Sequence, residues 1–218
     1  LGIQPLYHAE FSSASSKRQR YRSRSALGWP RVSAAQPNES HAALVKLEQT
    51  GLLAGVITQN VDRLHQRAGS QRVIDLHGRL DQVKCLDCSH VASREVIQSW
   101  IERHNALPDT SSLTLRPDGD ADLPDHYVKD FRVPQCRVCG GVVKPEVVFF
   151  GGTVPGPVVD ECYEIIDTSE GMMVVGSSLS VYSGLRFCRY AVDQGKPLII
   201  LNHGATRADA LCTHKCSS

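Results

Sequence analysis

The sequence has almost no excess of charge of either sign, because 24 Lys and Arg residues balance 23 Asp and Glu residues for a net charge of +1. A chain without a strong positive field has no overall attraction for nucleic acid or for acidic membrane surfaces. Aromatic residues make up only 6% of the chain, so the interleaving of basic and aromatic side chains that binds nucleic acid is missing as well. No apolar run approaches the roughly 20 residues that a membrane span needs. The sequence therefore predicts no nucleic-acid partner and no membrane partner.

The start of the sequence also lacks an initiator methionine, a signal peptide and a recognisable cleavage site. We therefore expect that a segment precedes Leu1. The first forty residues are polar and include a Ser/Arg-rich stretch at residues 12–25. This stretch is open to three interpretations: a solvated helix face, a mitochondrial presequence or a nucleic-acid patch. We favour the solvated helix face.

The sequence does have enough apolar residues, 41% of 218, to bury a core. Helical patterns end near residue 68 and cover residues 157–167 and 182–194, and they alternate with short β-rich runs. These runs lie at residues 52–58, 73–76, 142–150, 171–175 and 197–201. The alternation predicts an α/β fold with a Rossmann-like parallel sheet covered on both faces. Sheets of this kind bind ligands at the carboxyl ends of their strands.

Eight cysteines are present, and four of them form two Cys-x-x-Cys pairs, Cys85 with Cys88 and Cys136 with Cys139. Four thiolates satisfy a tetrahedral Zn²⁺ ion and leave no open position, so the pairs predict one structural zinc. An iron–sulfur cluster or a redox-active dithiol remains an alternative.

The cysteine pairs also suggest the domain organisation. Residues 81–141 are predicted to form a small zinc-binding module with a long loop at residues 105–125, inserted into a discontinuous Rossmann-like domain of residues 1–80 and 142–218. The other cysteines have no such spacing, and most of them are expected to be small buried hydrophobic residues. They are Cys162, Cys188, Cys212 and Cys216.

Polar side chains follow the first predicted strand of the sheet. They are Thr58, Gln59, Asn60 and Asp62, together with the apolar Val61. Amide and carboxylate groups at a strand end can hold ribose hydroxyls and a carboxamide. Ordinary turn chemistry is the alternative for a loop of this composition.

His77 comes directly after the next strand. An imidazole titrates near neutrality and can take a proton from a sugar hydroxyl, although a lone histidine can also be structural. Small residues follow two later strands and would let the backbone approach phosphate or ribose oxygens. They are Gly176, Ser177 and Ser178 after one strand, and Asn202, His203 and Gly204 after the other.

Together these motifs resemble the sirtuin family of NAD-dependent protein-lysine deacylases. Six motifs occur in the family's order. They are Thr-Gln-Asn-Val-Asp at 58–62, Leu-His-Gly at 76–78, the two cysteine pairs, Lys-Pro-Glu-Val-Val-Phe-Phe-Gly at 144–151, Gly-Ser-Ser-Leu at 176–179 and Leu-Asn at 201–202. Further features, at residues 18–21, 28–30, 36–38, 116–120 and 181–184, are similar to the mitochondrial class II, sirtuin-4 type.

The resemblance implies NAD⁺ as co-substrate and acyl-lysine proteins as substrates. An acyl-lysine oxygen attacks the ribose carbon that bears nicotinamide, and nicotinamide leaves. His77 as general base then deprotonates a ribose hydroxyl, which attacks the resulting imidate, and O-acyl-ADP-ribose is the product. Gln59 and Asn60 would hold the nicotinamide ribose and a water molecule, while Val61 and Asp62 would line the nicotinamide pocket.

The same resemblance assigns residues 176–178 and 202–204 to the rest of NAD⁺, and Cys216 to the adenine side. The substrate would enter as an extended strand between residues 149–151 and 179–182. It also implies a mitochondrial matrix location and mitochondrial metabolic enzymes as substrates. The acyl group is left open, between acetyl, lipoyl, biotinyl and branched chains, and so is protein ADP-ribosyltransferase activity.

Three departures from the family pattern temper these expectations. The 218 residues contain no first strand with a Gly-Ala-Gly-x-Ser loop, whose backbone amides would reach the pyrophosphate. Gly152 stands where an acidic residue is common, and residues 211–218 are expected to lack the final strand and helix. We therefore expect weak NAD⁺ binding by this polypeptide, and a catalytically inactive sirtuin fragment that acts as a zinc-bearing interaction module is the alternative function.

Overall fold

The computed structural model describes residues 6–108, 123 and 125–217. The chain divides into two compact units. Unit 1 consists of Leu1–His41, Asn60–Ala68 and His77–Thr153, and unit 2 consists of Ala42–Gln59, Gly69–Leu76 and Val154–Ser218. Residues 6–41 and 142–153 thus pack with the cysteine-bearing segment, whereas the domain boundaries predicted from the sequence placed them with the parallel sheet.

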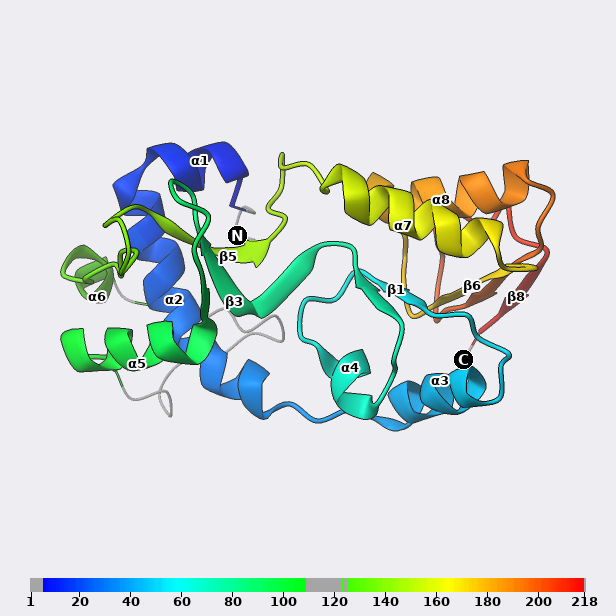
Figure 1. Ribbon diagram of the computed structural model, residues 1–218, viewed down its shortest axis with the longest axis horizontal. Coiled ribbons are helices and arrows are strands. Elements are labelled where there is room, and N and C mark those ends of the chain that lie inside the picture. The colour runs from blue at the N-terminus through cyan, green and yellow to red at the C-terminus, as the bar shows by residue number, and fades with distance from the viewer. Residues whose placement is uncertain (1–5, 109–122, 124, 218) are drawn as a thin grey trace. The chain divides into compact units, whose positions relative to one another are not determined.

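Unit 1 is built on an antiparallel sheet in the order β4–β3–β5, with the bounds Val91–Ser93, Gly78–Cys85 and Val143–Val147. Its helices are α1 (His8–Ser13), α2 (Ser15–Ala34), α4 (Leu64–Ala68), α5 (Arg94–His104) and α6 (Asp125–Lys129). Helices α2 and α5 pack against one another, and α5 also packs on β3 (Figure 1). The core between them contains Ala26, Val83, Ile97, Ile101 and Phe131. Residues 109–122 and 124 of the predicted long loop lie outside the described residues.

Helix α2 corrects the prediction of a solvated helix face at residues 12–25. The helix is present, but Arg22, Ser23 and Arg24 are buried, with exposed fractions of 0%, 1% and 7%. The Arg22 guanidinium donates to the Val143 carbonyl oxygen at 2.7 Å. Its apolar stem can enter the core because the long side chain carries its charge to a backbone acceptor on β5.

Unit 2 contains parallel strands, as the alternating pattern predicted. Strand β1 (Val56–Thr58) pairs with β2 (Val73–Asp75), and β6 (Met172–Val175), β7 (Leu198–Leu201) and β8 (His214–Cys216) form a second parallel group. Helices α7 (Gly156–Asp167) and α8 (Tyr182–Asp193) lie side by side (Figure 1). Most of α3 (Glu39–Gln49) also belongs to this unit. The core beneath α8 includes Val174, Leu185, Cys188, Leu198 and Ile200.

The prediction that residues 211–218 lack a final strand is wrong. Strand β8 pairs in parallel with β7, and Leu201 lies opposite Cys216. All three residues of β8 are exposed, so no apolar pattern marks the strand in the sequence, and its backbone hydrogen bonds alone define it.

Four strands of unit 2, β1, β2, β6 and β8, have an edge without a strand partner among the described residues. Strand β1 pairs only with β2, and β6 pairs only with β7. The unpaired side of such a strand offers backbone N–H and C=O groups to an added strand. In the described part of the chain, no helix has the length and apolar character needed to cross a membrane.

Candidate functional site

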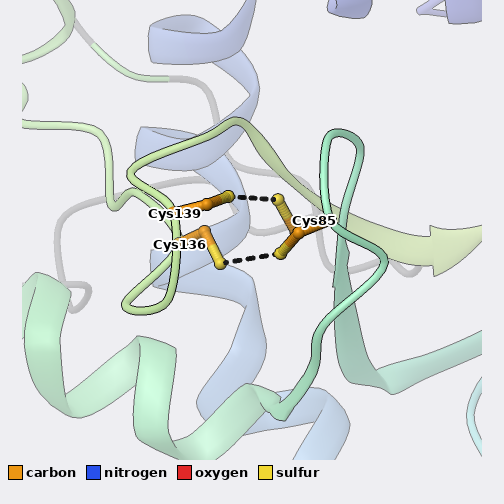
Figure 2. A group of neighbouring side chains, drawn as sticks. Cys85, Cys136 and Cys139 are labelled. Carbon is orange, nitrogen blue, oxygen red and sulfur yellow. Dashed lines mark hydrogen bonds between the residues drawn. The ribbon is translucent and has the colours of Figure 1, made fainter.

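The four paired cysteines come together at one end of unit 1. Their sulfur atoms lie within 4.8 Å of one another, with 3.5 Å between Cys85 and Cys139 and 3.7 Å between Cys88 and Cys136. Figure 2 shows Cys136 and Cys139 on one loop facing Cys85 at the end of β3. Zn–S bonds of about 2.3 Å in a tetrahedron place the sulfurs about 3.8 Å apart, whereas a disulfide requires about 2.05 Å. The donor set and spacing fit a closed zinc site.

The electrostatics of the cluster also suit a cation. Backbone amides of Cys139 and Val138 point at the Cys136 sulfur and lower its pKa to about 7. The Gly141 amide lowers the pKa of Cys139, but the neighbouring Cys88 and Cys85 sulfurs raise it overall to about 12. Crowded sulfurs resist becoming thiolates together unless a positive ion sits among them.

A carboxylate holds the two cysteine loops against each other. Asp87 lies between Cys85 and Cys88, and its Oδ2 atom accepts the Val142 backbone N–H at 3.1 Å. A Cβ atom on Gly141 would lie 1.9 Å from the same oxygen. Gly141 therefore leaves the space through which Asp87 reaches the second loop.

His77, the predicted general base, lies in unit 1 immediately before β3. Its side chain is half-buried, and its carbonyl oxygen accepts the Val148 N–H at 2.9 Å. This bond continues the β3–β5 pairing past Gly78. The backbone of His77 is thus fixed by the sheet of the cysteine-bearing unit.

Gly78 makes this close pairing possible. Its φ angle is +78°, and a Cβ atom there would lie 2.0 Å from the Glu146 carbonyl oxygen. Any side chain at position 78 would therefore meet both backbone strain and a clash with β5.

We expect Gly78→Ala to destabilise unit 1 by about 2–6 kcal/mol, because a left-handed non-glycine conformation and an overpacked contact each contribute about 1–3 kcal/mol. Gly140→Ala is the matched control, since Gly140 has a φ of +74° and open space around its Cβ position. Urea unfolding of both zinc-loaded variants measures the difference. Equal stabilities for the two variants would contradict the steric argument.

The loop at residues 60–62 also belongs to unit 1. The Asp62 carboxylate accepts the Leu64 N–H at 3.0 Å, and the Val61 carbonyl oxygen accepts the Leu80 N–H at 2.9 Å. Through Leu80 the loop is attached to β3, the same strand that begins one residue after His77. The structure therefore brings residues 60–62 and His77 to one end of β3.

A second group of predicted residues lies in unit 2, after β1 and β6. The Gln59 amide donates to the Ser177 hydroxyl at 2.9 Å, and that hydroxyl also accepts the Leu179 N–H at 3.2 Å. Thr58 is buried at the end of β1. Gly176 has a φ of +61° and nothing near its Cβ position, which leaves its backbone open to a ligand.

Gly184 is a site residue that the sequence did not reveal. A Cβ atom at this position would lie 2.9 Å from the Gln59 carboxamide carbon, so a larger residue would displace the Gln59 carboxamide from its present position. The available signal was a glycine inside a helical pattern, which lowers helix stability unless close packing requires it.

The remaining predicted residues lie beyond β7. Asn202 is buried, and its side-chain amide is 3.4 Å from the carbonyl oxygens of His203 and Gly204. Its backbone N–H donates to the Cys216 carbonyl oxygen at 3.2 Å. Cys216 thus lies beside Asn202, at the same strand ends as Gly176, whose N–H donates to the Leu201 carbonyl oxygen. Ser178, which follows in the same loop, is exposed.

The two groups have different chemical abilities. In unit 1, an imidazole, an amide and a carboxylate can move a proton and hold a polar ring substituent. In unit 2, small residues and backbone amides at the ends of parallel strands suit a nucleotide. The chain crosses between the units directly after Gln59 and directly before His77.

Comparison with known proteins gives a consistent result. The Sir2 family model matches residues 7–183. A Streptomyces coelicolor protein named NAD-dependent protein deacetylase 1 is 48% identical over 207 residues, which cover 95% of this chain and 69% of that protein. The Drosophila melanogaster NAD-dependent protein deacylase Sirt4 is 44% identical over 98% of this chain and 69% of its own length. A solved structure of Sir2 with a p53 peptide and NAD⁺ matches with a TM-score of 0.75 and 31% identity, over 99% of this chain and 80% of that one.

Proposed function

Because this chain belongs to the Sir2 family, we propose that it is an NAD-dependent enzyme that removes acyl groups from protein lysines. One observation carries the proposal: His77 and the loop at residues 60–62 are held at one end of β3 by backbone hydrogen bonds. A scaffold has no need of an imidazole at that position, whereas deacylation requires a base beside the nicotinamide ribose.

In this proposal the residues of unit 1 act on the reacting end of NAD⁺. His77 takes a proton from a ribose hydroxyl after nicotinamide has left, and Asn60 holds an ordered water molecule. Val61 and Asp62 line the nicotinamide pocket. The hydrogen bond from Leu80 to Val61 keeps that pocket in register with β3.

The residues of unit 2 bind the remainder of NAD⁺. Gln59 holds the nicotinamide ribose, and its amide is positioned by a hydrogen bond to the Ser177 hydroxyl. The loop at residues 176–178 and the turn at residues 202–204 would contact phosphate and the second ribose. Cys216 would lie on the adenine side, and the hydrogen bond from the Asn202 N–H to its carbonyl oxygen supports this assignment.

Zinc has a structural role in this proposal. Cys85, Cys88, Cys136 and Cys139 would hold the ion and leave no position for substrate. Bound there, zinc would fix the loop that leads into β5. It would thereby also help to fix Val148, whose backbone N–H donates to the His77 carbonyl oxygen.

The finer assignment is a sirtuin-4-type enzyme of the mitochondrial matrix that acts on metabolic enzymes. Its support is the similarity to a deacylase of that name. The acyl group is left open between acetyl, lipoyl, biotinyl and branched chains, and protein ADP-ribosyl transfer is a further activity to test.

The test is nicotinamide release coupled to removal of the acyl group from lysine peptides, with acetyl, lipoyl and biotinyl peptides compared side by side. It is run on the zinc-loaded chain and on a fusion that adds a strand and a Gly-Ala-Gly-x-Ser loop before Leu1. We expect NAD⁺-dependent deacylation in the fusion and weaker NAD⁺ binding by the unfused chain, because no Gly-Ala-Gly-x-Ser loop is present in the 218 residues. If both the chain and the fusion bind zinc and fold but neither removes an acyl group from any peptide, the proposal is contradicted.

A second candidate is an interaction module without catalysis. The open edges of β1 and β6 favour it, since each can accept an added strand. In that case the unfused chain would bind protein partners and zinc but not NAD⁺, and calorimetric titration with NAD⁺ separates the two functions.

A further inference from the structure

Asp87 lies in the first cysteine loop (residues 85–90), but its side chain reaches the second cysteine loop (residues 135–142). An antiparallel bridge between Gln135 and Val142 closes the second loop into a hairpin. The Asp87 carboxylate accepts the Val142 backbone N–H at 3.1 Å. The contact therefore joins the first loop to the closed end of the second, directly before β5.

The other backbone group of Val142 is also held by the first loop. Its carbonyl oxygen accepts the Leu86 N–H at 2.8 Å. Any residue except proline supplies a backbone N–H at position 86, whereas the bond to the Val142 N–H depends on the side chain at position 87. Asp87 is therefore the part of this connection that the choice of amino acid determines.

Gly141 leaves the space that the Asp87 carboxylate occupies. A Cβ atom on Gly141 would lie 1.9 Å from Oδ2 and 2.8 Å from Cγ of Asp87. The φ angle of Gly141 is outside the left-handed region that favours glycine. The missing side chain at position 141 thus serves the contact with Asp87 and not a turn of the backbone.

The same two residues also contact the sulfur cluster through their backbone. The Asp87 N–H donates to the Cys85 sulfur at 3.4 Å, and the Gly141 N–H donates to the Cys139 sulfur. These two sulfurs face one another at 3.5 Å (Figure 2). The contact between Asp87 and the second loop therefore lies beside a pair of sulfurs whose spacing it can fix.

We propose that Asp87 is a positioning residue of the zinc site. Its carboxylate holds the second cysteine loop on the first, so that the four sulfurs keep the spacing that Zn²⁺ requires. Residues that orient metal ligands without touching the metal typically change metal affinity by about 10–100-fold when they are replaced. This inference rests on the zinc site of the proposed function and not on the deacylation chemistry.

Asp87→Ala removes the carboxylate, and we expect it to weaken zinc binding about tenfold or more. The measurement is competition for zinc between the zinc-loaded chain and a chromophoric chelator of known zinc affinity. Asp130→Ala is the matched control, because Asp130 is exposed in unit 1 and lies outside both cysteine loops. A zinc affinity of Asp87→Ala equal to that of the wild type and of Asp130→Ala would overturn the proposal.

Asp87→Asn tests the hydrogen bond itself. The side-chain oxygen of asparagine can accept the Val142 N–H as the carboxylate does, so this variant is expected to recover most of the zinc affinity that Asp87→Ala loses. Equal zinc affinities for the two variants would contradict the role of the hydrogen bond. If Asp87 supported only the fold, Asp87→Ala would lower the unfolding temperature equally with zinc and with chelator, and its zinc affinity would stay at the wild-type value.

Gly141→Ala disturbs the same contact from the second loop. Its methyl group would displace the Asp87 carboxylate, so zinc affinity is expected to fall about tenfold in this variant as well. Adding Gly141→Ala to Asp87→Ala is expected to weaken binding by less than about threefold further, because contacting residues are not additive. In that background the carboxylate is already absent, and only the Cβ atom of residue 87, at 3.0 Å, remains near the new methyl group. Losses that multiply to about a hundredfold would show that the two residues act independently, against the proposal.

None of these readouts needs NAD⁺ or an acyl peptide, so the test of Asp87 stands apart from the test of deacylation. A chain that shows the expected zinc affinities but removes no acyl group would contradict the proposed function and leave the role of Asp87 intact. A wild-type chain that binds no zinc would remove that role.

Discussion

Cys136→Ser is expected to abolish stoichiometric zinc binding and to lower the unfolding temperature of unit 1 by about 10 °C or more. Binding of a structural zinc ion is part of the folding free energy, with apparent values of about 10–16 kcal/mol in small zinc sites. Losing even a third of this would exceed 3 kcal/mol, and each kcal/mol shifts the midpoint by about 2–4 °C in a chain of this size. Two backbone amides point at the Cys136 sulfur and favour its thiolate form.

The matched control is Cys212→Ser. Cys212 lies in unit 2, outside the sulfur cluster, and its sulfur donates to the Asp209 carbonyl oxygen at 3.2 Å. A serine hydroxyl can make the same bond, so this variant is expected to keep one zinc ion and nearly the wild-type stability.

Elemental analysis and thermal unfolding, with and without a chelator, measure both effects. Iron in place of zinc would support the cluster alternative, and a zinc-free protein with wild-type stability would show that the ion has no structural role. Chelation should reproduce the Cys136→Ser midpoint in the wild type and leave the Cys136→Ser midpoint unchanged.

The cysteine cluster could be predicted from the sequence because the two cysteines of each pair are only three positions apart. Two residues between Cys85 and Cys88 place both sulfurs on one side of a turn, and the same holds for Cys136 and Cys139. The structure had only to bring the two turns together, and the pairing of β3 with β5 does so.

Strands β1, β2, β6 and β7 and helices α7 and α8 of unit 2 were predicted for a similar reason. The runs that became β6 and β7 are short and apolar, and between them lies a helical pattern that ends within one residue of α8. These strands and helices are determined by residues close together in the sequence, and the periodicity of apolar residues over a short window reflects such local preferences.

Features set by distant contacts were missed. Arg22 is buried because a carbonyl oxygen 121 residues away accepts its hydrogen bond, and nothing in residues 12–25 indicates that acceptor. Gly184 is needed because Gln59 packs against it, 125 positions earlier in the chain. Strand β8 has three exposed side chains, so only its partner β7 defines it.

The expected effect of His77→Ala is a fall in the rate of deacylation of about 10²–10⁴-fold, the usual contribution of a positioned general base. The assay is run on whichever polypeptide, the chain or its fusion, removes the acyl group. In the proposed mechanism the base acts only after nicotinamide has left. Exchange of labelled nicotinamide into NAD⁺ in the presence of an acyl peptide should therefore persist in the variant, while release of deacylated peptide stops.

His104→Ala is the matched control for this experiment. His104 is exposed on α5 of the same unit and stacks on Trp100 with ring centroids 4.2 Å apart. Its removal is expected to leave deacylation within about a factor of two of the wild type, because surface substitutions away from special features change stability little.

Added imidazole gives a readout that a purely structural histidine would not move. If His77 supplies a base, free imidazole should restore part of the deacylation in His77→Ala and leave nicotinamide exchange unchanged. If His77 only supports the turn into β3, both reactions should fall together and imidazole should restore neither. Alanine keeps the backbone hydrogen bond between the His77 carbonyl oxygen and the Val148 N–H, so the difference between the two outcomes reports on the imidazole side chain.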